Sequence, residues 1–459
     1  MKLIEKVNAD FKKILEQSNA GAQMKQLTSQ MKEKEMDMQG KLFPTFLKPY
    51  FVETSDRYYI ARLTALMSLG LEKIGQAYLK EGKFKDIIEL KGRLADLVRV
   101  NPGYPRCQMV NRYDLFFNLV TKDLKFIEFN CGDPSGMGWN DDMLDIFCAL
   151  PVVRQLARKY EFTIDRLLDN HHRVLRRKYI QYCIGKNIIP EAKPNIALVC
   201  KRDSTIVGDF KAIVRYYRSL GYNALLADPR DFRYANKKLM LKDTHIPLLY
   251  RDAMEDFIKD EYWPDCQPII NAYRDGNVCF VNPIRAATGD FKAILEIMTE
   301  PKYEKFFSPE ERLAHKKHLP WTRLLRERKT TYRGRKVDLV SLVSKHRERF
   351  VLKPNSGYGG FGIVLGWKAD QKAWDETIQK ALAKKPSYAV QEKVDIPVEE
   401  FPVVEAGKLK GFATKYVNIN FWVHDGEFAG AFDRAAQGEL VNVHQGGGLV
   451  PVFFVNAKD

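Results

Sequence analysis

The pattern of apolar positions divides the chain into a helical first part and a mixed remainder. In residues 3–15, apolar side chains recur at three- and four-residue spacings, which places them on one buried helix face. A second helical pattern covers residues 56–100 and ends before an Asn-Pro-Gly turn sequence at 101–103. We therefore predict that residues 1–105 form a helical N-terminal region.

Short β-rich runs replace the helical pattern after this region. RYDLFFNLV and LKFIEFN are separated by turn residues at 121–123, so together they predict a hairpin. A helical pattern then returns at about 141–185. We predict that the hairpin and these helices belong to one unit, residues 106–190.

The following stretch predicts a βαβ unit within residues 191–300. NIALVC is typical of a strand, DFKAIVRYYRSLG of a helix closed by Gly221, and NALLAD of a second strand. The runs PLLYR, PIINAYR and NVCFVN predict further short strands. This alternation places the chain in the α/β (α+β) class.

Residues 301–459 alternate predicted strands, hairpins and helices. Ser308 and Pro309 are typical of a helix start, as N-cap and first helical residue, and two acidic residues follow them. A further helix is predicted at about 370–385, and the sequence His-Asp-Gly at 424–426 predicts a hairpin turn.

Charge and cysteine content narrow the class of protein. The 459 residues include 74 Lys and Arg against 58 Asp and Glu, a net charge of +16, which suits nucleic acid, nucleotide phosphates or an anionic substrate. No apolar run approaches the ~18 residues of a membrane span, and the first residues do not resemble a signal peptide. The seven scattered cysteines contain no C-x-x-C pair and favour a reducing, cytoplasmic location.

A basic run at residues 315–336 is the best candidate for nucleic-acid binding. It mixes cations with Trp321 and Tyr332, as single-strand binding surfaces do. However, its apolar residues between 319 and 325 have helical spacing, which favours an ordinary solvated helix.

The stretch FVLKPNSGYGGFGIVLGW contains a glycine-rich loop between two β-runs. GYGGFG formally satisfies G-x-G-x-x-G, but a dinucleotide-binding fingerprint needs a helix directly afterwards. Such a loop can instead bring backbone N–H groups close to phosphates, with Lys353 adding a charge. An ordinary turn is the alternative. Downstream, the edge strand YAVQE carries Gln391 and Glu392, which could hold a purine and a ribose.

Four polar residues of the predicted hairpin should share one face. A turn centred near residue 121 places Asp114 opposite Glu128 and Arg112 opposite Asn130. Two carboxylates and an amide oxygen suit Mg²⁺, and an adjacent arginine suits an anionic substrate. The alternative is a solvated sheet face with a surface salt bridge.

The C-terminal segment FAGAFDRAAQGELVNVHQGGGLVPVFFV contains Arg434, Asn442 and three successive glycines at 446–448. Successive glycines before an apolar strand suggest close approach to a ligand. Arg434 could bind a phosphate or carboxylate, or form a surface salt bridge.

These motifs resemble those of a known superfamily. R-Y-D…I-E-F-N with its loop C-G-D-P-S-G-M-G-W-N-D resembles R-x-D and E-Y-N-A-D-T-P of glutathionylspermidine synthetase. V-L-K-P with the glycine-rich loop resembles the ATP-grasp phosphate loop, and V-Q-E-K-V its nucleotide hinge. The segment D-R-A…L-V-N-V-H-Q-G-G-G is similar to R-V-A…V-N-S-x-Q-G-G-G of circularly permuted ATP-grasp proteins, and N-P-I-R-A-A-T-G-D-F-K to a synthetase segment. Over residues 107–459, the chain resembles the permuted branch of the ATP-grasp superfamily.

The resemblance implies a permuted ATP-grasp fold. Residues 106–190 would carry the metal-binding hairpin, 191–300 a pre-ATP-grasp domain and 301–459 the nucleotide-binding subdomains. Mg²⁺ would be held by Asp114, Glu128 and Asn130, and the reacting groups would lie near Arg112 and Arg434. The residues implied for ATP are Lys353, Gly357, Tyr358, Gly359, Gly360, Gly362, Gln391, Glu392, Val394 and Asn442.

The activity implied by the resemblance is that of a ligase that uses ATP and Mg²⁺. It would join a small-molecule carboxylate to an amine, or a thiol, through an acyl phosphate. The loop after Asn130 lacks the T-P-T of glutathionylspermidine synthetase, so the resemblance does not imply glutathione or spermidine as substrates. A nucleotide-binding protein without ligase activity is the first alternative, and a nucleic-acid-binding protein is the least favoured.

Overall fold

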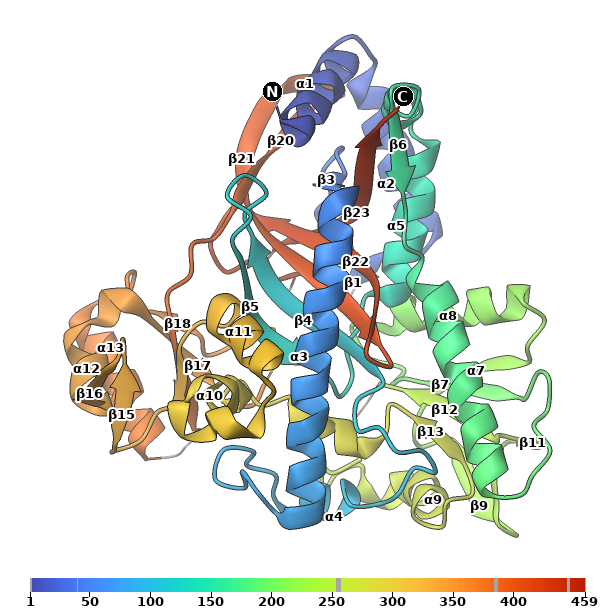
Figure 1. The fold of residues 1–459 in the computed structure, drawn as a ribbon. Coiled ribbons are helices and arrows are strands. Elements are labelled where there is room, and N and C mark those ends of the chain that lie inside the picture. Colours follow the sequence, from blue (N-terminus) through green and yellow to red (C-terminus); the bar gives the residue numbers. More distant parts are fainter. Residues whose placement is uncertain are drawn as a thin grey trace.

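One large sheet forms the centre of the fold (Figure 1). A computed structural model describes residues 2–38, 40–252, 257–357, 359–383, 387–443 and 446–458. The strands of the sheet are β3 (Tyr50–Glu53), β4 (Val110–Phe117), β5 (Leu124–Asn130), β6 (Tyr160–Thr163), β20 (Val398–Glu405), β21 (Lys408–His424), β22 (Glu427–Ala436) and β23 (Gly448–Ala457). Their order is β3-β23-β22-β21-β4-β5, with β20 paired to β21 and β6 to β23. The pairs are antiparallel except for β3 with β23, which is parallel.

Helices cover both faces of this sheet. α3 (Thr54–Glu81) crosses one face, in front of the strands in Figure 1. α5 (Met137–Ala149) and α7 (Leu167–Gly185) pack on the other, next to the short α6 (Pro151–Leu156). Because side chains alternate along a strand, Phe421 packs into the core under α3 and Trp422 into the core under α5 and α7. A polar side chain on this sheet must therefore be paired or line a cavity.

The N-terminal region is helical, as predicted. It contains α1 (Leu3–Glu16), α2 (Ala20–Glu33), α3 and α4 (Gly92–Leu97). It also contains the two-stranded β1 (Asp37–Met38) and β2 (Lys41–Leu42), and it contributes β3 to the central sheet. The region therefore shares the core of the sheet.

The predicted βαβ unit is confirmed. β7 (Ile196–Val199), α8 (Val207–Ser219) and β8 (Ala224–Ala227) follow one another, and the two strands pair in parallel. β12 (Leu248–Arg251) and β13 (Cys279–Val281) complete a parallel sheet in the order β13-β12-β7-β8. A small antiparallel sheet lies between β8 and β12 in sequence and consists of β9 (Phe232–Ala235), β10 (Lys238–Leu241) and β11 (Thr244–His245).

One predicted strand in this unit is wrong. PIINAYR belongs to α9 (Trp263–Arg274), a helix with Pro264 in its first turn. The buried residues Cys266, Ile269, Ile270 and Tyr273 have helical spacing, and the strand prediction overlooked it because the run was considered without the residues before it.

A smaller lobe packs beside the central sheet and has its own core. Its sheet has the order β14-β19-β17-β18, formed by β14 (Thr322–Leu324), β17 (Phe350–Pro354), β18 (Val364–Leu365) and β19 (Tyr388–Glu392). The hairpin β15 (Lys329–Tyr332) and β16 (Arg335–Asp338), the helices α12 (Leu339–Lys345) and α13 (Gln371–Leu382) and the turn η3 (Arg347–Arg349) complete it. α13 confirms the helix predicted at 370–385. The prediction of YAVQE as an edge strand is wrong, because β19 pairs with β14 on one side and with β17 on the other. The core includes Leu352, Trp374 and Val390.

The helix expected in the basic run 315–336 is wrong. α11 (Pro309–His318) has the predicted capping box at Ser308 but ends at His318, and β14 and β15 follow. Pro320 explains the end, because the residue before a proline avoids helical geometry. Trp321 and Tyr332 pack against each other and against Phe350, so their rings support the lobe.

Short helical elements connect the βαβ unit to this lobe. They are η1 (Ile284–Gly289), α10 (Ile294–Thr299) and η2 (Pro301–Phe306). Among the described residues, no helix has the length and apolar composition that crossing a membrane requires.

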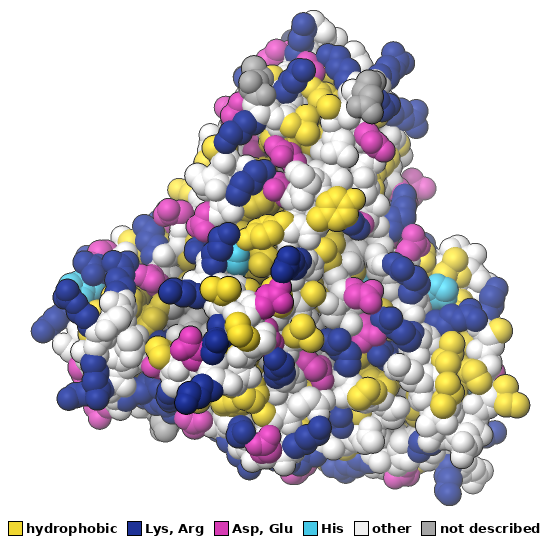
Figure 2. Space-filling model, viewed as in Figure 1, with side chains coloured by type: hydrophobic (Ala, Val, Ile, Leu, Met, Phe, Trp, Pro, Cys, Tyr) yellow, Lys and Arg dark blue, Asp and Glu magenta, His cyan; other side chains and the backbone are white. Residues whose placement is uncertain are grey.

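The positive charge of the chain is concentrated in the small lobe. Residues 321–393 contain 17 Lys and Arg against seven Asp and Glu, an excess of ten out of a net +16. Figure 2 shows Lys and Arg side chains crowding the surface of this lobe, at the left of the view. The lobe that carries the glycine-rich loop is thus the most cationic part of the molecule, which favours anionic ligands nearby.

Candidate functional site

A cavity lies between the small lobe and the central sheet. It encloses about 1050 Å³, part of it open to solvent. Every predicted site residue lines it except Gly362, which belongs to the same loop, and Tyr358, which lies outside the described residues. The predicted residues in its lining are Arg112, Asp114, Glu128, Asn130, Lys353, Gly357, Gly359, Gly360, Gln391, Glu392, Val394, Arg434 and Asn442. The fold thus gathers residues that are more than 300 positions apart in sequence.

The acidic hairpin has the predicted register. Arg112 pairs with Asn130 and Asp114 with Glu128 across β4 and β5, and a bulge follows between Asp114 and Leu115. The Asn130 amide nitrogen donates to Asp114 Oδ1 at 3.1 Å, and Arg112 Nε lies 3.1 Å from the same oxygen. Arg112, Asp114 and Asn130 therefore form one hydrogen-bonded group, and Glu128 lies opposite Asp114 on the same cavity face.

Arg434 extends this group from β22. Its Nη2 lies 2.6 Å from Asp114 Oδ2, 2.6 Å from Asn418 Oδ1 and 2.8 Å from Asn420 Oδ1. Burial raises the pKa of Asp114, but Arg434 and Arg112 outweigh burial and hold it below its usual range. Asp114 is thus a buried carboxylate that stays ionised between two guanidinium groups.

Asn418 and Asn420 were missed by the sequence analysis. Both lie on the long strand β21, where Asn418 is opposite Arg434 and Asn420 opposite Asp114. The only local signal is the polar alternation N-I-N within an apolar strand, which is typical of any half-buried strand.

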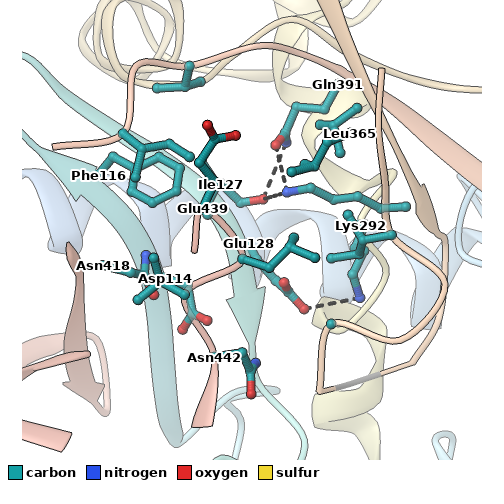
Figure 3. Close-up of a pocket in the computed structure, with 18 of the residues that line it drawn as sticks. Asp114, Phe116, Ile127, Glu128, Lys292, Leu365, Gln391, Asn418, Glu439 and Asn442 are labelled. Atoms are coloured by element: carbon teal, nitrogen blue, oxygen red, sulfur yellow. Dashed lines mark hydrogen bonds and ion pairs between the residues drawn. The ribbon is translucent and has the colours of Figure 1, made fainter. Parts of the chain in front are cut away.

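Lys292 is a second residue that the sequence analysis missed. It follows η1, at the end of the N-P-I-R-A-A-T-G-D-F-K segment, and it is buried. Its ammonium lies 3.0 Å from Glu128 Oε1 and donates to the backbone oxygen of Gly357 at 2.7 Å. Lys292 thus links the acidic hairpin to the glycine-rich loop (Figure 3).

The glycine-rich loop joins β17 to β18, as predicted, and these strands pair antiparallel. Gly357, Gly359, Gly360 and Gly362 all have positive φ angles, between 70° and 123°, which side chains rarely tolerate. Before the loop, Lys353 donates to Gln391 Oε1 at 2.8 Å. Burial lowers the pKa of Lys353 to about 8, although Glu128 opposes this change.

The cavity has two chemically different ends (Figure 3). Asp114, Glu128, Lys292 and Asn442 lie at one end. At the other end lie the apolar Phe116, Ile127 and Leu365, with Gln391 and Glu439.

Glu439, at the second end, is a further lining residue that the sequence analysis missed. It accepts a hydrogen bond from the Trp367 indole at 2.6 Å, and Lys368 Nζ lies 3.4 Å away. An apolar slot with a few fixed polar groups is typical of a nucleoside site, and a cationic and acidic end is typical of a phosphate site.

Comparisons with known proteins agree with this arrangement. A family model described as a circularly permuted ATP-grasp matches residues 217–391, which include Lys292, Lys353, the glycine-rich loop and Gln391. A glutathione synthetase-like effector from Globodera pallida has the same fold, with a TM-score of 0.61 and 12% identity, over 96% of this chain and 97% of its own. The family match covers residues 217–391, and the chain has a permuted ATP-grasp fold.

Two further comparisons add little to this. A RimK domain ATP-grasp protein from Sphaerobacter thermophilus matches at 12% identity over 55% of this chain and 97% of its own. Its TM-score of 0.27 does not indicate a shared overall fold. A search of the curated proteins finds no match. The family match and the effector structure therefore identify the permuted ATP-grasp fold but no substrate.

The acidic hairpin fits a hard divalent cation. In the described part of the chain, no cluster of three or more His, Cys, Asp and Glu could hold a metal ion. The candidate set instead has two carboxylates, Asp114 and Glu128, with the Asn130 amide oxygen beside them. All three are oxygen donors, and a set with few protein ligands suits Mg²⁺, which keeps waters and shares its coordination with phosphates.

Proposed function

We propose that the protein is an ATP- and Mg²⁺-dependent ligase that joins a carboxylate to an amine, or to a thiol, through an acyl phosphate. The observation that carries this proposal is the two-ended cavity, with an apolar slot at one end and paired acids and cations at the other. ATP-grasp proteins are in general ATP-dependent ligases, which supports the proposal.

Lys353, Lys292 and the glycine-rich loop would bind the triphosphate. Both lysines line the cavity next to the loop, and the positive φ angles let the backbone approach a ligand closely. Gln391, Glu392 and Val394 would hold the base at the C-terminal end of β19, and Asn442 would contact the phosphates. This placement would fix the γ-phosphate near Asp114 and Arg434.

The acidic hairpin would supply the metal site. Asp114, Glu128 and Asn130 would hold Mg²⁺, which neutralises phosphate charge when bound. Arg112 and Arg434 would orient the substrate carboxylate and stabilise negative charge on the transferring phosphoryl group. The carboxylate oxygen attacks the γ-phosphorus and ADP leaves. The amine then attacks the acyl carbon and releases inorganic phosphate, with loss of one proton from nitrogen.

The proposed function is tested by substrate-dependent phosphate release. The purified protein is incubated with ATP, Mg²⁺ and pools of carboxylic acids and amines, and inorganic phosphate is measured over time. We expect release that requires both pools and that falls to the background in Glu128→Ala. Binding of ATP without any substrate-dependent release would contradict the ligase proposal and favour a nucleotide sensor.

Glu439 gives the nucleoside end a specificity that can be measured. Its carboxylate lies at the apolar end of the cavity, held by Trp367, and it can accept hydrogen bonds from a ribose diol. We expect wild-type protein to bind ATP about tenfold more tightly than 2′-deoxy-ATP, and Glu439→Ala to lose this preference. Calorimetric titration with the two nucleotides measures it. An unchanged preference in Glu439→Ala would show that another group binds the ribose.

A further inference from the structure

The carboxylates at the phosphate end already have cationic partners. Asp114 is held by Arg112 and Arg434, and Lys292 lies against Glu128. At this end, two carboxylates therefore face three cations, Arg112, Arg434 and Lys292, and the end is electropositive. Lys353 adds a positive charge to the same cavity, with its ammonium bonded to Gln391. Such a site attracts a polyanion and repels a free divalent cation.

Backbone hydrogen bonds hold Lys292 in place, in addition to its ion pair with Glu128. Its backbone N–H donates to the Asn355 backbone oxygen at 2.9 Å, and the next residue, Ala293, donates to the Asn355 side chain at 2.9 Å. Asn355 directly follows β17 and precedes the glycine-rich loop. The ammonium is thus anchored where it contacts both Glu128 and Gly357, and only its side chain has to move to change partners.

We propose that Lys292 acts as an internal counter-ion for Glu128, so that the divalent cation binds together with the triphosphate and not before it. The triphosphate supplies the negative charge that draws the ammonium off Glu128, and the freed carboxylate then accepts the cation. Nucleotide and metal are in this way positively coupled, and by linkage each raises the affinity for the other. This inference rests on the proposed function, because it assumes that the cavity binds a triphosphate.

The test measures the binding of Mn²⁺ without nucleotide. Binding is monitored by electron paramagnetic resonance, in which only the free ion gives a strong signal. Wild-type protein is expected to bind Mn²⁺ weakly without nucleotide. Lys292→Met and Lys292→Gln should each bind it about tenfold more tightly. Two variants are used so that the result does not depend on how one replacement packs, and thermal unfolding establishes that each is folded.

Lys353→Met is the matched control. It removes one positive charge from the same cavity, but Lys353 contacts Gln391 and the Ile127 backbone, neither of which is a carboxylate. We expect its affinity for Mn²⁺ alone to stay within about threefold of wild type. An equal gain in Lys353→Met would show a general effect of charge and overturn the inference, as would tight binding of Mn²⁺ alone by wild type.

A second titration separates this inference from the proposed function. ATP is titrated in EDTA, and we expect wild-type protein to bind it without metal and Lys292→Met to bind it about tenfold more weakly. If wild-type protein binds no ATP with or without metal, the proposed function fails. If ATP binds only when metal is already bound, the proposed function stands and the role of Lys292 is overturned.

Discussion

Replacing Arg434 by methionine is expected to lower the free energy of unfolding by about 3–5 kcal/mol, the range for removing one partner of a buried ion pair. Asp114 and Arg434 are both buried, at 6% and 5% exposure, so water cannot replace the lost guanidinium. The variant also removes the donor that Asn418 and Asn420 share. Urea unfolding at neutral pH measures the loss. The same change is expected to abolish any phosphate release.

Arg112→Met is the matched control for this prediction. Arg112 also pairs with Asp114, but its side chain is more exposed, at 14%, and its other bond is to the backbone oxygen of Ser135. We expect a loss of about 1–2 kcal/mol, because Arg434 still pairs with Asp114 in this variant and the lost Arg112 is itself partly exposed. Equal losses in the two variants would mean that Arg434 has no special role in compensating Asp114.

The predicted register of the acidic hairpin is correct, but the turn alone does not determine it, because a bulge intervenes. In a regular antiparallel hairpin, the position of the turn fixes which residues are opposite one another. The prediction placed Asp114 opposite Glu128, as the structure does, although Leu115 beyond the bulge pairs with Phe126. The bulge lies between the polar pairs and the turn near residue 121. Counting from the actual centre of the turn, without the bulge, would therefore have predicted a pairing of Asp114 that is shifted by one residue.

The remaining cavity residues could not be predicted because they depend on long-range pairing. Asn418 and Asn420 join the Asp114–Arg434 pair, through bonds to Arg434, only because β21 pairs with β22 and, some 300 residues away in sequence, with β4. Lys292 reaches Glu128 because its backbone is bonded to Asn355, at the end of β17. Neither contact leaves a periodic pattern, and a single Lys or Asn is too common to be selected without the fold.

The two wrong elements have a common physical cause. α9 was predicted as a strand, and the basic run after α11 as a helix, because each was judged on a window of fewer than ten residues. In such windows, strand and helix spacings overlap. Pro264 and Pro320 would have decided both cases, since one favours a helix start and the other ends a helix. The positions of these two prolines were therefore the sequence evidence that both predictions failed to use.

Asp433, next to Arg434, lies on the opposite face of the sheet in an apolar environment. It is fully buried, and its neighbours across the sheet are Ile419 on β21 and Val450 on β23. Neither carboxyl oxygen has a hydrogen-bond partner among the described residues. Burial raises the pKa of Asp433 well above its ordinary value, although Arg434 opposes this. The carboxyl group is therefore protonated in the folded protein at pH values where the unfolded chain has lost the proton.

Asp433→Asn should become more stable relative to wild type as the pH rises. An acid with a raised pKa in the folded state binds its proton there and releases it on unfolding, so wild type loses stability above the unfolded value near 3.9. The loss is about 1.4 kcal/mol for each pH unit over which the folded carboxyl stays protonated. The amide of the variant has no proton to release in this range, so urea unfolding at several pH values should show the difference between the two proteins growing by that amount.

Asp228→Asn supplies the comparison for this pH series. Arg230 and backbone N–H groups outweigh burial and lower the pKa of Asp228 to about 2, so its carboxylate is ionised in both states above pH 5. Its difference from wild type should therefore stay constant from pH 5 to 8. Other buried acids, such as Asp141 and Asp290, whose pKa values burial raises to about 7, are present in every variant and cancel in the differences. If the stability difference between Asp433→Asn and wild type does not change with pH, the Asp433 carboxylate of the wild type is ionised in the folded protein and is stabilised by Arg434.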